Sequence, residues 1–282
     1  MGKGLEVRTK LQQVVVAVKQ VPDTTQVKID PEKGTLIREG IPFIINPFDA
    51  HAVEEALRLK DQFGCQVTAI TMGPANSVIT LKKCLALGVD HVFLISDRQF
   101  AGADTLATSY VLAEAIKKIE KELGRVDLVI CGRQTIDGDT AQVGPGIATR
   151  LNLSQLTLVD QILEVDIKEW IIKVRRKLEG RKEIVQAQLP AMLALTREIN
   201  QPRYPTVPKR LEAEEVQSPV WDNSEMKLLP DRIGMKGSPT NVKKIFSPER
   251  AKGEILGDGD GDPRGAVQLL IRKLVEKGLI SV

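Results

Sequence analysis

Continuous apolar runs alternate with helix-spaced apolar residues over the first half of the chain. Val14 to Val18 form an uninterrupted apolar run, which is typical of a strand buried on both faces. Similar runs predict strands over residues 66–72, 91–95 and 127–131. Helical periodicity separates these strands. The alternating order predicts an α/β fold with a doubly wound, mainly parallel sheet and right-handed crossovers.

Residues typical of helix ends mark the predicted helices. Asn46 can cap a helix that Pro47 begins, and Asp49 lies near its positively polarised end. Asp104 can cap a long helix, and Gly88 can end a shorter one. The predicted helices begin at Pro47, near Val78, at Asp104 and at Thr140. A short hairpin is predicted from residues 27–29 and 35–37.

The pattern changes after residue 151, where strand-like runs are joined by charged turns. These runs predict an antiparallel extension of the sheet, over residues 156–165, 170–174, 183–188 and 192–195. Three prolines, Pro202, Pro205 and Pro208, predict an extended and exposed segment. Residues 213–264 have weak periodicity, and residues 266–279 have the pattern of one amphipathic helix. We therefore expect an α/β domain over residues 1–212 and a C-terminal arm over residues 213–282.

Composition narrows the class of protein. The 282 residues carry a net charge of only +3, which gives no electrostatic reason to expect nucleic acid or an anionic membrane as a partner. Cys65, Cys84 and Cys131 form no C-x-x-C pair and lie in or beside apolar runs, so we expect buried thiols rather than metal ligands or disulfides. The N-terminus lacks a signal-peptide core. We expect a soluble, cytoplasmic protein without direct membrane insertion.

The segment from Gly132 to Ala148 is the most informative about ligands. It is rich in glycine, follows a predicted strand and precedes a predicted helix. Free backbone amides and the helix dipole at such a point favour a phosphate. It matches neither a Walker loop nor G-x-G-x-x-G, so a connector that binds nothing stays possible. The residues that favour the phosphate site are Gly138 for a positive φ, Asp139 and Thr140 for a cap, and Gly144 and Gly146 for close approach to the backbone.

Ordered motifs along the chain resemble those of electron transfer flavoprotein beta subunits. They keep that family's order and spacing from residue 13 to about residue 210. The matching segments are Ala17–Asp23, Asn46–Asp49 followed by Glu54-Glu55-Ala56, Thr71–Pro74, the loop Cys131–Gly146, and Asn200–Tyr204. The resemblance implies an adenine nucleotide alpha hydrolase-like fold with a bound adenine nucleotide. No carboxylate or cysteine spacing in the sequence indicates a catalytic triad or a metal site.

The resemblance also assigns residues to two sites. The implied cofactor-binding residues are Ala17, Asn46, Pro47, Phe48, Asp49, Met72, Asp104, Thr105, Thr108, Gly138, Asp139, Thr140, Ala141, Gln142, Val143, Gly144 and Thr149. A recognition loop near residues 197–208 is expected to dock partner dehydrogenases, through Ile199, Asn200, Pro202, Arg203 and Tyr204. Ile199 fits a satellite core residue equally well. Asp104 also fits an ordinary helix cap, and the two roles are compatible.

The identity of the nucleotide depends on the subgroup. Most members of the family hold AMP, whereas the electron-bifurcating members hold a second FAD. Gly102–Thr108, Asp139–Pro145, Lys236–Thr240 and the long arm resemble the bifurcating subgroup. The resemblance therefore implies FAD, with AMP as the alternative, and NADH as the hydride donor.

That assignment implies a set of partners and leaves a rival class. The implied partners are an electron transfer flavoprotein alpha subunit, on which the arm and its helix would pack, and either an acyl-CoA dehydrogenase or a quinone oxidoreductase with iron–sulfur centres. One electron would pass to the FAD of the alpha subunit and one to a second acceptor of higher potential. A nucleotide-binding regulatory module of the universal-stress type is the alternative from another class.

Overall fold

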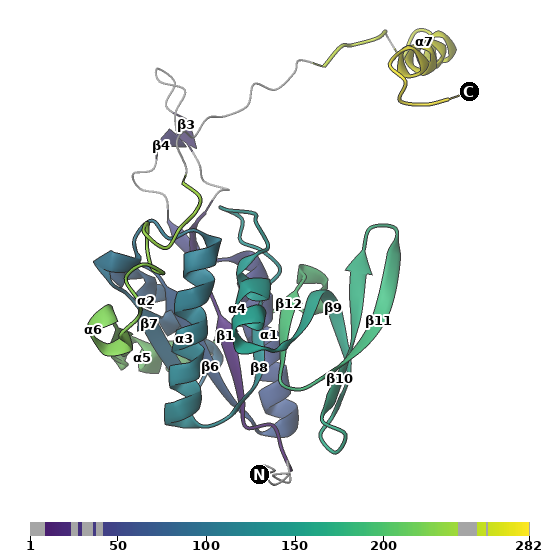
Figure 1. The fold of residues 1–282 in the computed structure, drawn as a ribbon. Coiled ribbons are helices and arrows are strands. Elements are labelled where there is room, and N and C mark those ends of the chain that lie inside the picture. The colour runs from purple at the N-terminus through teal and green to yellow at the C-terminus, as the bar shows by residue number, and fades with distance from the viewer. Residues whose placement is uncertain are drawn as a thin grey trace. The chain divides into compact units, whose positions relative to one another are not determined.

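The computed structural model describes residues 9–23, 28–29, 36–37, 42–241, 253–257 and 259–281. The chain forms two compact units, Met1–Lys243 and Lys244–Val282. Within the described part of the first unit, nine strands form one sheet in the order β11-β10-β9-β12-β8-β1-β6-β7-β13 (Figure 1). Its parallel centre consists of β12 (Ala191–Leu195), β8 (Val126–Gly132), β1 (Gln13–Ala17), β6 (Gln66–Met72) and β7 (His91–Ile95). The predicted α/β class and doubly wound sheet are confirmed.

Helices cover both faces of this sheet (Figure 1). Alternate residues of a strand point to opposite faces, and β1 serves both: Val14 and Val16 lie in one core, Val15 and Ala17 in the other. The first core packs against α1 (Pro47–Phe63) and α2 (Val78–Leu87), and the second against α3 (Thr105–Leu123) and α4 (Val143–Leu151). A strand between two helical layers must be apolar throughout, which explains the uninterrupted run in β1.

Most of the predicted helix ends are confirmed, including the starts at Pro47 and Val78, and two predictions are wrong. The Asp104 carboxylate accepts hydrogen bonds from Leu106 N and Ala107 N and so caps α3, and Gly88 ends α2 in the left-handed conformation. Asn46 precedes α1 but makes no side-chain cap. The last helix of the parallel part begins at Val143 rather than Thr140. Asp139 and Ala141, which precede it, have a positive φ that a right-handed helix cannot contain.

The strands after residue 151 depart from the prediction in one respect. β9 (Ser154–Asp166), β10 (Ile171–Leu178) and β11 (Arg181–Gln188) pair antiparallel, as predicted. β12 does not extend this set, because it lies between β8 and β9 and pairs parallel with both. All five of its residues are buried, as a central strand requires.

Short strands and turns complete the first unit before the arm. β2 (Gln20–Pro22) pairs with β5 (Phe43–Ile45), and β3 (Lys28–Ile29) pairs antiparallel with β4 (Leu36–Ile37). The pairing expected for the 27–29 and 35–37 hairpin is therefore present, while its turn lies outside the described residues. Single turns of 3₁₀ helix occur at η2 (Ala75–Ser77), η3 (Arg98–Phe100) and η4 (Arg197–Ile199).

The compact unit extends past residue 212, where we expected the arm to begin. β13 (Val220–Trp221) pairs with β7, and the Trp221 ring stacks on Phe93 with 4.1 Å between centroids. Leu228 and Ile233 are buried in the same core. Pro208 lies in helix α5 (Val207–Glu215), not in an extended segment as predicted, and α6 spans Asn223–Met226.

The second unit contains helix α7 (Pro263–Glu276), near the predicted bounds. The Asp262 carboxylate caps it through Gly265 N. Along the helix, Val267, Leu270 and Ile271 keep 54 %, 45 % and 41 % of their surface exposed. This apolar face agrees with the predicted amphipathic pattern.

The three cysteines are free and buried, as expected. Burial raises the pKa of Cys84 and Cys131 to about 12 and that of Cys65 to about 11. Among the described residues, none of the helices combines the length and apolar character that a bilayer crossing requires. The same residues contain no group of three His, Cys, Asp or Glu side chains arranged to hold a metal ion.

Gly144 provides a test of the packing between α4 and the sheet. A Cβ at this position would lie 2.7 Å from Cys131 Sγ and 3.3 Å from Met192 Sδ. We expect Gly144→Ala to lower the free energy of unfolding by roughly 1–3 kcal/mol through overpacking. The matched control is Gly138→Ala, where the nearest atom would be Thr135 Oγ1 at 3.6 Å, and we expect a change within about 0.5 kcal/mol. Urea unfolding of both variants measures the difference, and equal effects would contradict this account.

Candidate functional site

The strand order reverses between β1 and β8. From β1 the sheet continues to β6 and β7 on one side, and from β8 to β12 on the other. Ala17 ends β1 opposite Cys131 of β8, so the loops that follow the two strands leave the same edge. In open α/β sheets, ligands bind in the crevice that such a reversal leaves at the carboxyl ends of the strands.

A buried carboxylate holds the two sides of this crevice together. Asp49, in the first turn of α1, accepts hydrogen bonds from Lys19 N at 2.8 Å and from Gly132 N at 3.0 Å, and it is only 4 % exposed. Burial raises its pKa to about 7, although the hydrogen bonds from Lys19, Asn46 and Gly132 act to lower it. α1 comes so close that a Cβ on Gly132 would lie 2.5 Å from Asp49 Oδ1. Residue 132 must therefore be glycine.

The start of α1 also holds the loop that follows β8. Asn46 Nδ2 donates to Gln134 O at 2.9 Å, and Asn46 Oδ1 accepts from Ile136 N at 3.2 Å. Lys19 Nζ lies 2.6 Å from Asp137 Oδ2. Burial opposes ionisation of Asp137, but the contacts with Lys19 hold the pKa of that carboxyl below its usual range. The Asn46 side chain thus binds the loop instead of capping its own helix.

The backbone of the loop turns at residues that the sequence did not single out for that role. Asp139 and Ala141 have φ of 52° and 56°, whereas Gly138, predicted to provide a positive φ, does not. Asp tolerates this left-handed conformation because its short polar side chain bonds locally, and Asp139 Oδ1 accepts from Gln134 Nε2. Residues 137–142 are exposed. The loop is therefore fixed at its base and open to solvent at its tip.

The start of α4 remains open to an anion. Its N-cap residue Gln142 makes no side-chain cap, because Gln142 Oε1 instead accepts from Thr105 Oγ1 at 2.8 Å. The first amides of a helix have no partner within the helix. Asp139 and Thr140, predicted to cap, lie upstream of the helix and do not cap it. The amides of α4 are thus available to a phosphate.

Gly144 and Gly146 have a packing role that was not predicted from the sequence. A Cβ on Gly144 would meet Cys131 Sγ, and a Cβ on Gly146 would lie 2.6 Å from Ser109 Oγ. Both glycines therefore allow α4 to pack closely on the sheet and on α3. Thr149, one turn further on, is exposed and donates to Pro145 O at 3.0 Å.

Asp104 caps α3 and also binds Ser238 and Thr240, near the end of the first unit. Its Oδ2 accepts from Thr240 N at 3.1 Å and Thr240 Oγ1 at 2.8 Å, and its amide donates to Ser238 Oγ at 2.8 Å. Burial acts to raise the pKa of Asp104, but the hydrogen bonds from Ala107, Thr240 and Leu106 hold it below the usual range. Two segments that resemble the bifurcating subgroup are thus in contact. Of the two roles considered for Asp104, the helix cap is seen directly, in its hydrogen bonds with Leu106 N and Ala107 N.

Other predicted cofactor-binding residues lie near the same edge. Ala17 is nearly buried and Met72 is half-buried, and both belong to the core on the α3 and α4 side. Thr108 is half-buried in the first turns of α3, where its amide donates to Asp104 O. Pro47 takes the first helical position of α1, as predicted.

A hollow at this edge combines two predicted cofactor-binding residues, Phe48 and Asp139, with residues that the sequence did not single out. It has a volume of about 510 Å³ and is lined by Phe48, Arg133, Gln134, Ile136, Asp139, Arg197 and Glu198. The Arg197 and Arg133 guanidinium carbons lie 4.4 and 5.5 Å from the centre of the Phe48 ring. Arg133 directly follows β8, and Arg197 follows β12 after Thr196, and this position after a buried strand was the available sequence signal.

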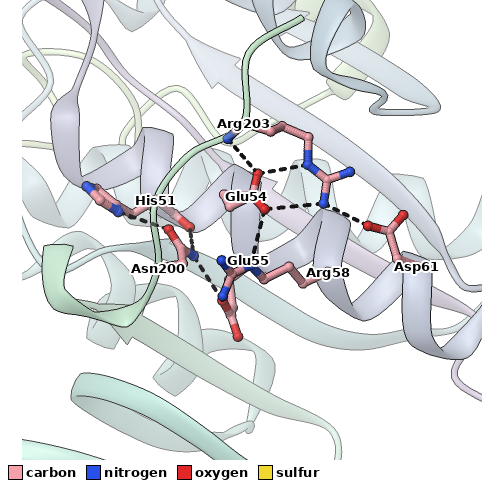
Figure 2. Close-up of polar contacts among 7 residues, drawn as sticks. All are labelled: His51, Glu54, Glu55, Arg58, Asp61, Asn200 and Arg203. Carbon is pink, nitrogen blue, oxygen red and sulfur yellow. Dashed lines mark hydrogen bonds and ion pairs between the residues drawn. The ribbon is translucent and has the colours of Figure 1, made fainter.

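The predicted recognition-loop residues are divided by their exposure. Ile199 packs against the core on the α1 side, which is the satellite-core alternative for this residue. Asn200 and Arg203 turn towards α1 (Figure 2). Pro202 is half-buried, and Tyr204 is 91 % exposed. Docking through these residues remains a prediction.

Fold and site together define a doubly wound α/β protein with a candidate nucleotide crevice at its strand reversal. The profile of the electron transfer flavoprotein domain matches residues 33–225. The chain therefore belongs to the electron transfer flavoprotein family.

Similar proteins cover nearly the whole chain. Protein FixA of Azotobacter vinelandii is 44 % identical over 263 residues, covering 92 % of this chain and 93 % of its own. The electron transfer flavoprotein subunit beta of Clostridium acetobutylicum is 45 % identical over 268 residues, covering 95 % and 99 %. Subunit CarD of the caffeyl-CoA reductase-Etf complex of Acetobacterium woodii is 45 % identical over 270 residues, with the same coverage.

The buried Asp49 predicts a specific pH dependence. Its pKa is about 7 in the folded chain and 3.8 as a free side chain, so the folded state holds a proton that the unfolded state releases between these values. Stability should therefore fall as the pH rises through this window, by up to about 1.4 kcal/mol per pH unit. Asp49→Asn should remove this contribution, whereas the exposed Asp231→Asn should not. Urea unfolding from pH 4.5 to 8 measures the slopes, and an unchanged slope in Asp49→Asn would rule out the assignment.

Proposed function

We propose that this chain is the beta subunit of an electron transfer flavoprotein and binds FAD in the crevice between β1 and β8. The observation that carries the proposal is the open start of α4, which lies beside the strand reversal between β1 and β8. The chain's membership of the family supports it. Anions bind where helix amides have no other partner. AMP is the alternative ligand, and it would make the chain a non-bifurcating subunit.

The residues present fit a nucleotide phosphate. The exposed turn from Asp139 to Ala141 leads into amides that no side chain caps. The Asp104 carboxylate is already engaged by hydrogen bonds from Thr240 and from the α3 amides. We propose that Gly138 to Gly144 hold the phosphates, with Ala17 and Met72 lining the nucleotide beside them and Asn46 holding the loop in place.

The redox chemistry would come from the bound cofactor. FAD supplies the capacity to accept a hydride from NADH and to release electrons one at a time. The chain's own residues bind, orient and shield: Asn46 and Asp49 fix the loop, and Thr105 fixes the start of α4 through Gln142. We assign no side chain as a general acid or base.

The relatives support a function within a larger complex. One similar protein is a subunit of a caffeyl-CoA reductase-Etf complex, and another is an electron transfer flavoprotein subunit beta. We propose that the chain pairs with an alpha subunit, on which the arm packs through the exposed apolar face of α7. An acyl-CoA dehydrogenase or a quinone oxidoreductase with iron–sulfur centres would exchange electrons with the pair. Free, buried thiols fit a reducing cytoplasm.

The cofactor content of the purified complex tests this function. After co-expression with the alpha subunit, we expect two FAD per heterodimer and bleaching of the flavin absorbance by NADH. One FAD plus one AMP, with no reduction by NADH, would exclude the bifurcating assignment. A colourless protein that retains only ATP or AMP would favour the nucleotide-binding regulatory module.

A loop variant tests the position of the nucleotide. Asp139→Ala with Thr140→Ala should weaken nucleotide retention by the beta subunit about tenfold, because alanine in the left-handed position costs about 1–2 kcal/mol. The FAD of the alpha subunit should stay bound. Glu179→Ala is the control, because Glu179 is exposed in the turn between β10 and β11. Flavin and AMP are quantified after gel filtration, and unchanged retention in the double variant would show that the loop is not the site.

A further inference from the structure

The recognition loop is attached to α1 by a compact polar cluster (Figure 2). We call this cluster the α1 clamp: His51, Glu54 and Glu55 on the helix, with Asn200 and Arg203 on the loop. Arg58 and Asp61 surround it on the helix side. Two of the residues that the resemblance assigns to partner docking therefore bind the chain's own first helix.

Arg203 makes the denser half of the clamp. Its Nε donates to Glu54 Oε2 at 2.9 Å and its Nη2 to Glu54 Oε1 at 3.2 Å, a two-pronged contact. The Arg203 backbone amide also donates to Glu54 Oε2, at 3.0 Å. Asp61 Oδ2 accepts from Nη2 at 2.7 Å. Side chain and main chain of Arg203 are thus fixed by one carboxylate, so the contact sets the path of the loop.

Asn200 makes the other half. Its Nδ2 donates to Glu55 Oε2 and to His51 O, each at 2.9 Å. Its Oδ1 therefore faces His51 Nδ1, at 2.9 Å, and accepts the ring proton. Every hydrogen-bonding atom of the amide group is directed at α1, so the side chain is positioned to hold the loop rather than to contact a partner.

Release of the loop would take Arg203 away from the buried Glu54 and leave that carboxylate with Arg58, whose side chain is 48 % exposed. Glu54 and Glu55 are only 5 % and 8 % exposed. Burial acts to raise the pKa of Glu54, yet the hydrogen bonds and charge of Arg203 hold it below its usual range. Removing the closer of its two cations from a buried carboxylate is destabilising. The loop is therefore held in one conformation even without a partner.

The residues that follow the clamp expose large apolar side chains to solvent. Tyr204 follows Arg203 directly and is 91 % exposed, and Val207 and Leu211 on α5 are 69 % and 65 % exposed. Large apolar side chains on a fixed backbone bind with a smaller entropy loss than the same side chains on a mobile loop.

We infer that Glu54 and Arg203 are positioning residues, which hold the recognition loop in its docking conformation before a partner arrives. They act through the residues that follow them and do not themselves touch the partner. This inference rests on the proposed function for the identity of the partner, but the fixed loop itself does not depend on it.

Amide hydrogen exchange tests the clamp directly. In the purified α–β complex, Arg203→Met should speed exchange of the amides in residues 199–206 by roughly tenfold or more. Arg203→Lys keeps the charge without the fork and should give an intermediate rate. The matched control is Arg58→Met, because Arg58 also pairs with Glu54, at 3.2 Å, yet lies on α1 and has no bond to the loop within the described residues. An unchanged rate in Arg203→Met, or an equal rise in Arg58→Met, would overturn the clamp.

Electron exchange with a reduced acyl-CoA dehydrogenase tests the docking role. Arg203→Met should raise the KM for the dehydrogenase about tenfold and leave kcat within about twofold, because only association uses the loop. Flavin content and reduction by NADH should match the wild type. Faster amide exchange with an unchanged KM would overturn the docking role. If the wild-type complex does not react with the dehydrogenase, the proposed partner is wrong, and the amide exchange rates still decide whether the clamp exists.

Discussion

The buried carboxylate of Asp49 is the contact on which the candidate site depends. It joins the first turn of α1 to the residues that follow β1 and end β8, which are the two sides of the strand reversal. Asn46, three residues earlier, binds the loop after β8 from the same helix start. The start of α1 therefore organises the site, because the Asn46 side chain binds the loop after β8 and does not cap its own helix. Gly132 permits this arrangement because any side chain there would collide with Asp49 and Phe48.

The sequence predicted the framework because one physical rule sets it. Strands buried between two helical layers must be apolar at every position, and β6 and β7 occur at the predicted bounds, with β1 and β8 within a residue of theirs. The position of β12 was predicted wrongly because a short apolar run does not indicate which strands it pairs with. Trp221 was missed for a related reason: a two-residue strand has no detectable period.

The site was predicted by position rather than by role. Gly138 was expected to provide a positive φ, but Asp139 and Ala141 make the turn. The packing of Gly144 and Gly146 against the sheet and α3 was not predicted. Such roles depend on tertiary contacts between α4, the sheet and α3, which the local sequence does not specify. Thr105 and Gln142 lie far apart in the chain, yet their hydrogen bond joins the starts of α3 and α4. With Asp104 bonded to Ser238 and Thr240, one series of contacts runs from the loop to the chain that precedes the arm.

The insertion of β12 between β8 and β9 has a consequence for how the protein can be made. As the chain leaves the ribosome, β8 and β9 emerge well before residues 191–195, which pair with both of them. Until then each strand presents an open edge, and open edges invite pairing with other chains. A fragment that stops at the end of α4 would therefore leave the β8 edge without its partner strand. The hairpin of β10 and β11 belongs to the same folding unit as the crevice, although it lies at the far edge of the sheet (Figure 1).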